Sequence, residues 1–195
     1  MDTIEKLTRS LAGLLVTVGV TVIVSQPSYA GNTYYCDRAT NNNGDSVPAT
    51  YARTPRGQVP IIYWIFTVSG WSPQARCEEV SLRLQRFHDN GLLNYLNAAI
   101  VNGQPAICVT PEVGVNCEHL LVMLPSHMDA NYGLSLLLDI RGRVRGRRLE
   151  IGRGPVFYDN LQLYVDVEKF IDFISEEEME RTDESRSNST IDREL

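Results

Sequence analysis

The chain has 195 residues, a formal net charge of −6 at neutral pH and 43% hydrophobic residues. This length allows a single domain with a sizeable core. The acidic balance argues against a nucleic-acid-binding protein. The negative charge lies mostly at the C-terminus, because residues 176–195 contain eight acidic and three basic residues, whereas residues 31–175 are nearly neutral.

The first thirty residues are typical of an export signal. Lys6 and Arg9 precede the apolar residues 11–24, and Ser28 and Ala30 form a Ser-x-Ala cleavage pattern. The apolar run covers about 21 Å as a helix, less than the roughly 30 Å of a bilayer core. We therefore expect cleavage after Ala30 and an extracytoplasmic protein, either periplasmic, lumenal or secreted. An uncleaved anchor is the alternative.

Four cysteines follow the signal, and an even number in an exported chain favours disulfides. A metal site is the rival interpretation, but the closest two cysteines are nine residues apart, unlike the close pairs of zinc sites. Of the three possible connectivities we favour Cys108 with Cys117, which would flank one turn between strands, and hence Cys36 with Cys77.

The segment 33–68 favours strands. We expect a short strand at 33–38, an exposed loop at 41–45, and strands at 50–53 and 58–68. The last strand carries β-branched and aromatic residues typical of a buried sheet position, namely Ile61, Ile62, Trp64, Ile65 and Phe66.

The clearest helix begins at Ser72, which is a good N-cap, continues with Pro73 at the first helical position and ends before Gly91. One stripe of this helix is expected to be buried: Cys77, Val80, Leu84 and Phe87.

A β-hairpin follows the helix. Asn102-Gly103 accepts the positive φ angles of a type I′ turn and joins strands at 98–101 and 106–110. We expect a further strand at 118–124 and a helix at about 129–140.

The alternating residues of 161–165 predict a strand, and the spacing of apolar residues in 167–174 predicts a helix after it. Residues 176–195 offer almost no large apolar side chains, so we expect a disordered acidic tail.

These elements indicate an α+β fold, in which a small, mainly antiparallel sheet packs with two or three helices and is stabilised by two disulfides. We assign it to a single domain at 31–175.

The sequence shows no nucleophile and base, carboxylate pair or phosphate loop at a recognised spacing. His88, His119 and His127 are scattered over a predicted helix, strand and loop. We therefore expect no catalytic residues, no cofactor and no metal.

A dense cluster of arginines interleaved with glycines is the main candidate site. Guanidinium groups bind phosphate or sulfate oxygens bidentately, so an anionic membrane or envelope surface is the expected partner. The alternative is a solvated turn whose arginines pair with nearby carboxylates. The cluster consists of Arg141, Arg143, Arg145, Arg147, Arg148 and Arg153.

The region from Tyr51 to Trp71 is a second candidate, because its aromatic and basic residues are suited to a ligand-binding cleft. The plainer interpretation is core and rim. The residues concerned are Tyr51, Arg53, Arg56, Tyr63, Trp64 and Trp71.

Four blocks carry a family resemblance: 49–57 (ATYARTPRG), 72–81 (SPQARCEEVS), 93–96 (LNYL) and 101–105 (VNGQP). Over approximately residues 34–172 the chain resembles the cyanobacterial circadian oscillating protein (COP) family, and its four cysteines look like the set of that family. The resemblance implies an exported or peripherally membrane-associated protein, and it supplies no established activity or catalytic residues.

Two hypotheses follow. The first is a non-enzymatic, disulfide-bonded protein at the surface of a membrane or envelope, with no nucleic-acid partner. The second is a ligand-binding or enzymatic domain that uses the Tyr51–Trp71 region as a cleft. Protein partners and oligomeric state do not follow from the sequence.

Overall fold

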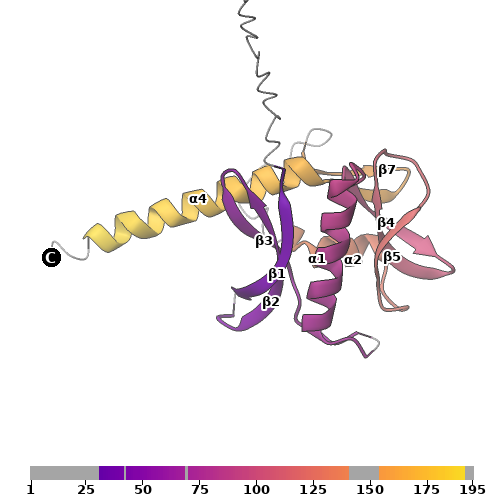
Figure 1. The fold of residues 1–195 in the computed structure, drawn as a ribbon, viewed down its shortest axis with the longest axis horizontal. Coiled ribbons are helices and arrows are strands. Elements are labelled where there is room, and N and C mark those ends of the chain that lie inside the picture. The colour runs from indigo at the N-terminus through magenta and orange to yellow at the C-terminus, as the bar shows by residue number, and fades with distance from the viewer. Residues whose placement is uncertain (1–30, 42, 69, 141–153, 192–195) are drawn as a thin grey trace, which may run out of the picture.

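The fold is described from a computed structural model, which covers residues 31–41, 43–68, 70–140 and 154–191. The predicted export signal and the arginine cluster lie outside the described residues. Element labels follow Figure 1.

A three-stranded antiparallel sheet opens the domain, in the order β1-β2-β3. Its strands are β1 (Thr33–Thr40), β2 (Ser46–Thr54) and β3 (Gly57–Tyr63). A β-bulge at Thr50 and Tyr51 shifts the register between β2 and β3. A bulge bends its strand locally and changes the direction of nearby side chains. Thr50, at this bulge, has a fully buried side chain.

A second, five-stranded sheet has the order β6-β5-β4-β8-β7, and all its neighbouring strands are antiparallel. Its strands are β4 (Tyr95–Val101), β5 (Gln104–Thr110), β6 (His119–Met123), β7 (Val156–Asp159) and β8 (Gln162–Asp166). The β4–β5 turn has the predicted geometry, since Asn102 and Gly103 have φ of 51° and 75°.

The described helices are α1 (Pro73–Asp89), α2 (Ala130–Leu137) and α4 (Val167–Ile191). In Figure 1, α1 lies between the two sheets, and α4 crosses one end of the three-stranded sheet. One hydrophobic cluster contains residues of both sheets and of all three of these helices. The predicted α+β fold is confirmed, with the strands divided between two sheets.

The helix α1 forms where its sequence predicts. The Ser72 side chain accepts a hydrogen bond from the Ala75 amide at 3.2 Å, as an N-cap does. The buried stripe of α1 contains Cys77, Val80 and Leu84, as expected, together with Ser81.

The strand predicted at 58–68 is too long, because β3 ends at Tyr63. The Trp64 amide still donates to the Pro48 carbonyl at 2.9 Å, after which the chain leaves the sheet. Ile65 and Phe66, expected to be buried, are 50% and 73% exposed. Residues 64–68 and 70–72 therefore lie outside the sheet and between the two elements, and are here called the β3–α1 loop.

A turn at Asn160 and Leu161, with φ of 45° and 65°, connects β7 to β8, and β8 pairs with β4 of the same sheet. The sequence analysis did not predict β7, because the turn lacks the glycine that normally marks such a geometry. Asn131 of α2 holds this turn, since its side chain donates to the Leu161 carbonyl at 3.0 Å and accepts from the Leu163 amide at 2.8 Å.

Replacing Leu161 by glycine should stabilise the protein. A leucine with positive φ is strained by about 1 kcal/mol, and the Leu161 side chain is 89% exposed, so little packing is lost. We expect L161G to raise the free energy of unfolding by up to about 1 kcal/mol in urea denaturation. The reverse change at the equivalent turn, G103L, is the control and should lower it; equal effects of both variants would contradict the explanation.

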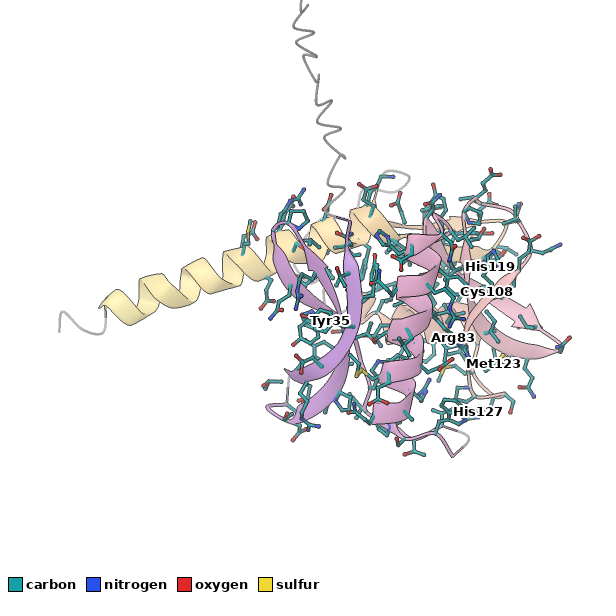
Figure 2. The ribbon with its side chains drawn as sticks, viewed as in Figure 1. Tyr35, Arg83, Cys108, His119, Met123 and His127 are labelled. Atoms are coloured by element: carbon teal, nitrogen blue, oxygen red, sulfur yellow. A yellow bond between two sulfur atoms is a disulfide. The ribbon has the colours of Figure 1, made fainter. Side chains whose placement is uncertain are left out.

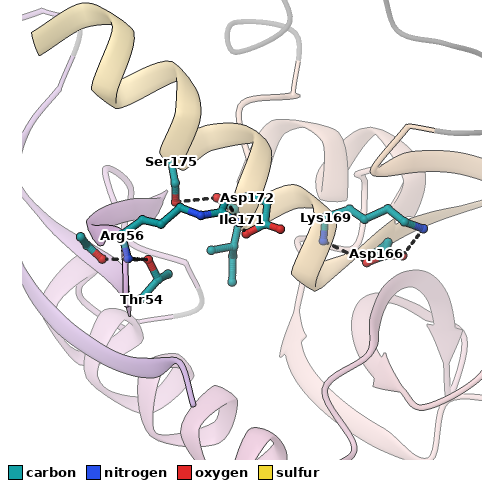
Figure 3. Close-up of polar contacts among 8 residues, drawn as sticks. Thr54, Arg56, Asp166, Lys169, Ile171, Asp172 and Ser175 are labelled. Carbon is teal, nitrogen blue, oxygen red and sulfur yellow. Dashed lines mark hydrogen bonds and ion pairs between the residues drawn. The ribbon is translucent and has the colours of Figure 1, made fainter. Parts of the chain in front are cut away.

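The helix α4 is tied to the β2–β3 turn by an ion pair between Arg56 and Asp172 at 3.0 Å (Figure 3). Inside the same helix, the Ser175 hydroxyl donates to the Ile171 carbonyl at 2.7 Å. The far half of α4 projects away from the sheets (Figure 1). The acidic segment is helical as far as Ile191, where α4 ends. Its disorder in solution stays a prediction.

Candidate functional site

Both predicted disulfides are present. Cys36 of β1 is bonded to Cys77 of α1, and Cys108 of β5 is bonded to Cys117, with Cα atoms 5.5 Å apart in each pair. The first bond joins the three-stranded sheet to the buried face of α1, and the second closes the loop before β6. Disulfides of this kind persist in oxidising compartments, which indicates an extracytoplasmic setting.

The three histidines lie apart. His88 contacts the Tyr34 ring, His119 contacts the Phe87 ring, and His127 is exposed in the loop before α2. Figure 2 shows His119 and His127 apart, both on the side of the molecule that carries the five-stranded sheet. Within the residues that the structure describes, no group of three or more His, Cys, Asp or Glu side chains is placed to hold a metal ion.

The region from Tyr51 to Trp71 does not form one cleft. Tyr51 stacks on Tyr35 at 5.6 Å, and Arg53 lies over the Tyr35 ring at 4.8 Å. Because side chains alternate along a strand, Tyr35 faces away from Cys36 and hence away from α1. Arg56 pairs with Asp172, as described above. Within the described residues, the end of the region from Tyr63 onward lines a cavity.

That cavity has a volume of about 530 Å³ and lies between the β3–α1 loop and α2. Its walls are mainly apolar side chains: Ile65, Phe66, Leu124, Met128, Leu136 and Leu137. Ile65, Phe66 and Leu136 are each at least half exposed, so they surround its mouth. Its size is within the range of small-molecule sites.

The close approach of α2 to the end of β6 shapes one wall of the cavity. Gly133 permits this approach, because a Cβ atom at that position would collide with Leu124 Cδ1 and come within 3.0 Å of Met128 Sδ. Both of those side chains line the cavity.

Trp64 forms another wall and is held by a buried polar network. The Trp64 Nε1–H donates to Thr50 Oγ1 at 3.0 Å, and the Ser81 hydroxyl donates to the same oxygen at 3.0 Å. All three side chains are at most 2% exposed. The network fixes the indole of Trp64 relative to both β2 and α1.

Among the described residues that line this cavity, Arg76, in the first turn of α1, is the basic one. Its guanidinium carbon lies 4.7 Å from the centre of the Trp64 ring, which is cation–π geometry. Burial lowers the pKa of Arg76. Among the described residues no carboxylate pairs with it. Glu79, three residues further along α1, instead accepts a hydrogen bond from Arg83 Nε at 2.8 Å.

A smaller cavity of about 390 Å³ adjoins the first, and Val68, Arg76 and Leu124 line both. It lies between α1 and β6. Figure 2 shows Arg83 on the side of α1 that faces the five-stranded sheet, where its guanidinium donates to the Leu121 carbonyl at 2.8 Å. Arg83 is therefore engaged within the protein, in contrast to Arg76.

Sequence reasoning missed this arrangement. The sequence analysis named neither Arg76 as a site residue nor Thr50 and Ser81 as partners of Trp64. One sequence feature pointed to this site. The apolar run continues to Phe66, three residues beyond the end of β3 at Tyr63, and its last residues line the cavity.

The geometry defines a disulfide-stabilised α+β domain with an open apolar cavity and one basic side chain set into its wall. The family profile of circadian oscillating protein COP23 matches residues 33–172, which is most of the chain, so the chain belongs to this family. The resemblance noted in the sequence is thus confirmed. Comparison with curated proteins and with solved structures finds no match.

No helix in the described part of the chain is both long and apolar enough to cross a membrane.

Proposed function

We propose that this COP23 family member is an exported, non-enzymatic protein that attaches peripherally to an anionic membrane or envelope surface. The observation that carries the proposal is the exposure of Ile65, Phe66 and Trp71, all on the β3–α1 loop. Large apolar side chains grouped on one exposed segment are typical of interaction sites. Aromatic residues in particular favour the boundary between water and lipid.

Two features support the exported setting and the anionic partner. The two disulfides suit an oxidising compartment, in agreement with a signal at residues 1–30. The arginine cluster, Arg141 to Arg153, would attract anionic headgroups, an attraction that salt weakens. Apolar insertion and basic attraction together give firmer attachment than either one alone.

The test measures co-sedimentation of the oxidised chain with vesicles of phosphatidylcholine and phosphatidylglycerol. Replacing both Phe66 and Trp71 by serine should lower the vesicle partition coefficient about tenfold or more, because each aromatic side chain contributes about 1.5–3 kcal/mol when fully buried. The matched control replaces Tyr158 and Leu161 by serine; these side chains are also more than half exposed but lie on the β7–β8 hairpin, and the partition coefficient should not change.

The basic contribution is measured separately. Glutamine at the six positions of the arginine cluster should weaken binding at low salt and remove most of its salt dependence. Absence of vesicle binding at low salt, or binding that neither set of substitutions weakens, would overturn the proposal.

A second role, ligand binding, is favoured by the cavity beside the β3–α1 loop. This second role corresponds to the ligand-binding alternative of the sequence analysis, with the cleft restricted to the end of the Tyr51–Trp71 region.

A further inference from the structure

Arg76 occupies an unfavourable position for a cation. The N-terminal end of a helix carries a partial positive charge, so basic side chains in the first turn are disfavoured. The first turn of α1 contains no acidic residue to compensate it. Arg76 is also half-buried, and a desolvated cation needs an anionic partner.

The contact with Trp64 orients the Arg76 guanidinium. The group lies over the indole ring, and the Thr50 hydrogen bond holds that ring in place. Stacking engages the face of the guanidinium and leaves the N–H groups at its edge available for hydrogen bonds. A planar cation presented in this way suits a carboxylate, phosphate or sulfate oxygen pair.

The remainder of the 530 Å³ cavity is suited to an apolar group. Leucine, isoleucine, phenylalanine and methionine side chains form most of its walls, as described above. Among the described residues of its lining, the other charged side chain is that of Asp139, just after α2. A single carboxylate there disfavours a ligand with a second negative charge.

We propose that this cavity binds an amphipathic monoanion, a compound with one anionic head and an apolar tail. The head pairs with the Arg76 guanidinium, and the tail lies among Phe66, Leu124 and Leu136. A free fatty acid and a membrane lipid share this chemistry. The site does not depend on membrane attachment, although the β3–α1 loop contributes to both.

Calorimetric titration of the oxidised chain with sodium dodecanoate, below its micelle concentration, tests the proposal. We expect one molecule to bind per chain. The neutral analogue dodecan-1-ol and the cation dodecyltrimethylammonium should bind at least about tenfold more weakly, because a hydrogen bond to a charged group contributes more than a neutral one.

Two variants locate the site. R76Q should weaken dodecanoate binding about tenfold to a hundredfold and bring it close to that of dodecanol. Its control is R86Q, an exposed arginine of the same helix that lines neither cavity. L136D, which places a carboxylate at the mouth, should also weaken binding, whereas L82D on the exposed face of α1 should not. Circular dichroism and thermal melts verify that each variant is folded.

The two sources of ligand give different results. Binding of free dodecanoate that depends on Arg76 supports the proposal with a soluble ligand. Binding to anionic vesicles alone, lost in R76Q and L136D but kept in R86Q, supports it with a bilayer lipid. Measurable binding of dodecanoate and dodecanol with equal affinity, the same affinity in R76Q as in the parent, or no binding to either dodecanoate or anionic vesicles would overturn it. Vesicle binding that depends on Phe66 and Trp71 but not on Arg76 would overturn this inference and leave the proposed function intact.

Discussion

Replacing Cys36 and Cys77 together by alanine should lower the free energy of unfolding by about 3.9 kcal/mol. The disulfide spans 41 residues, and opening it restores the conformational entropy of that loop to the unfolded chain. For a domain of this size the loss corresponds to a fall in melting temperature of roughly 8–16 °C. Differential scanning calorimetry of the two forms gives both quantities.

The second disulfide provides the matched control. Cys108 and Cys117 are nine residues apart, so alanine at both positions should cost only about 2.6 kcal/mol by the same relation. The Cys36–Cys77 bond also joins α1 to β1, and its loss should loosen this contact in hydrogen exchange. A larger effect from the Cys108–Cys117 pair would show that loop length does not govern the stabilisation.

Local chemistry explains what the sequence predicted well. The ends of α1 follow from Ser72, Pro73 and Gly91, and the β4–β5 turn follows from Asn102-Gly103, because each of these residues acts on its own neighbours. The disulfide partners were also predicted from the sequence, because Cys108 and Cys117 flank one turn between strands and their pairing leaves Cys36 for Cys77.

The cavity was beyond such reasoning because it depends on contacts between distant segments. Thr50, Trp64 and Ser81 come from β2, the β3–α1 loop and α1, and nothing in their local sequence indicates that their side chains meet. The same applies to Gly133, whose missing side chain matters only because Leu124 lies against it.

The exposure of Ile65 and Phe66 shows most directly what sequence periodicity cannot predict. Their pattern continues that of β3, so periodicity assigns them to the strand and to the core. The sheet ends at Tyr63, and the chain must turn towards α1 to allow the Cys36–Cys77 bond and the Ser72 cap. Tertiary constraints therefore place two apolar residues at the mouth of the cavity, where local preference alone would bury them.

Replacing Thr50 by valine should lower the free energy of unfolding by about 2–3 kcal/mol. Valine has nearly the same shape, but it removes the oxygen that accepts hydrogen bonds from Trp64 and from Ser81. A buried donor left without an acceptor costs about 1–3 kcal/mol. The Ser81 hydroxyl can rotate to a carbonyl of its own helix, so the Trp64 indole N–H should account for most of the loss. Urea denaturation monitored by circular dichroism measures it.

Two further variants separate the network from simple packing. S81A keeps the hydrogen bond between Trp64 and Thr50 and should cost at most about 1 kcal/mol. The double variant T50V/S81A should be about as stable as T50V, because the acceptor is already lost. Additive losses would mean that the two bonds act independently and that Thr50 is not their common anchor. Since Arg76 stacks on the indole that Thr50 holds, T50V should also weaken dodecanoate binding although Thr50 does not line the cavity. An unchanged affinity in a destabilised T50V protein would show that packing alone positions Trp64 for the ligand.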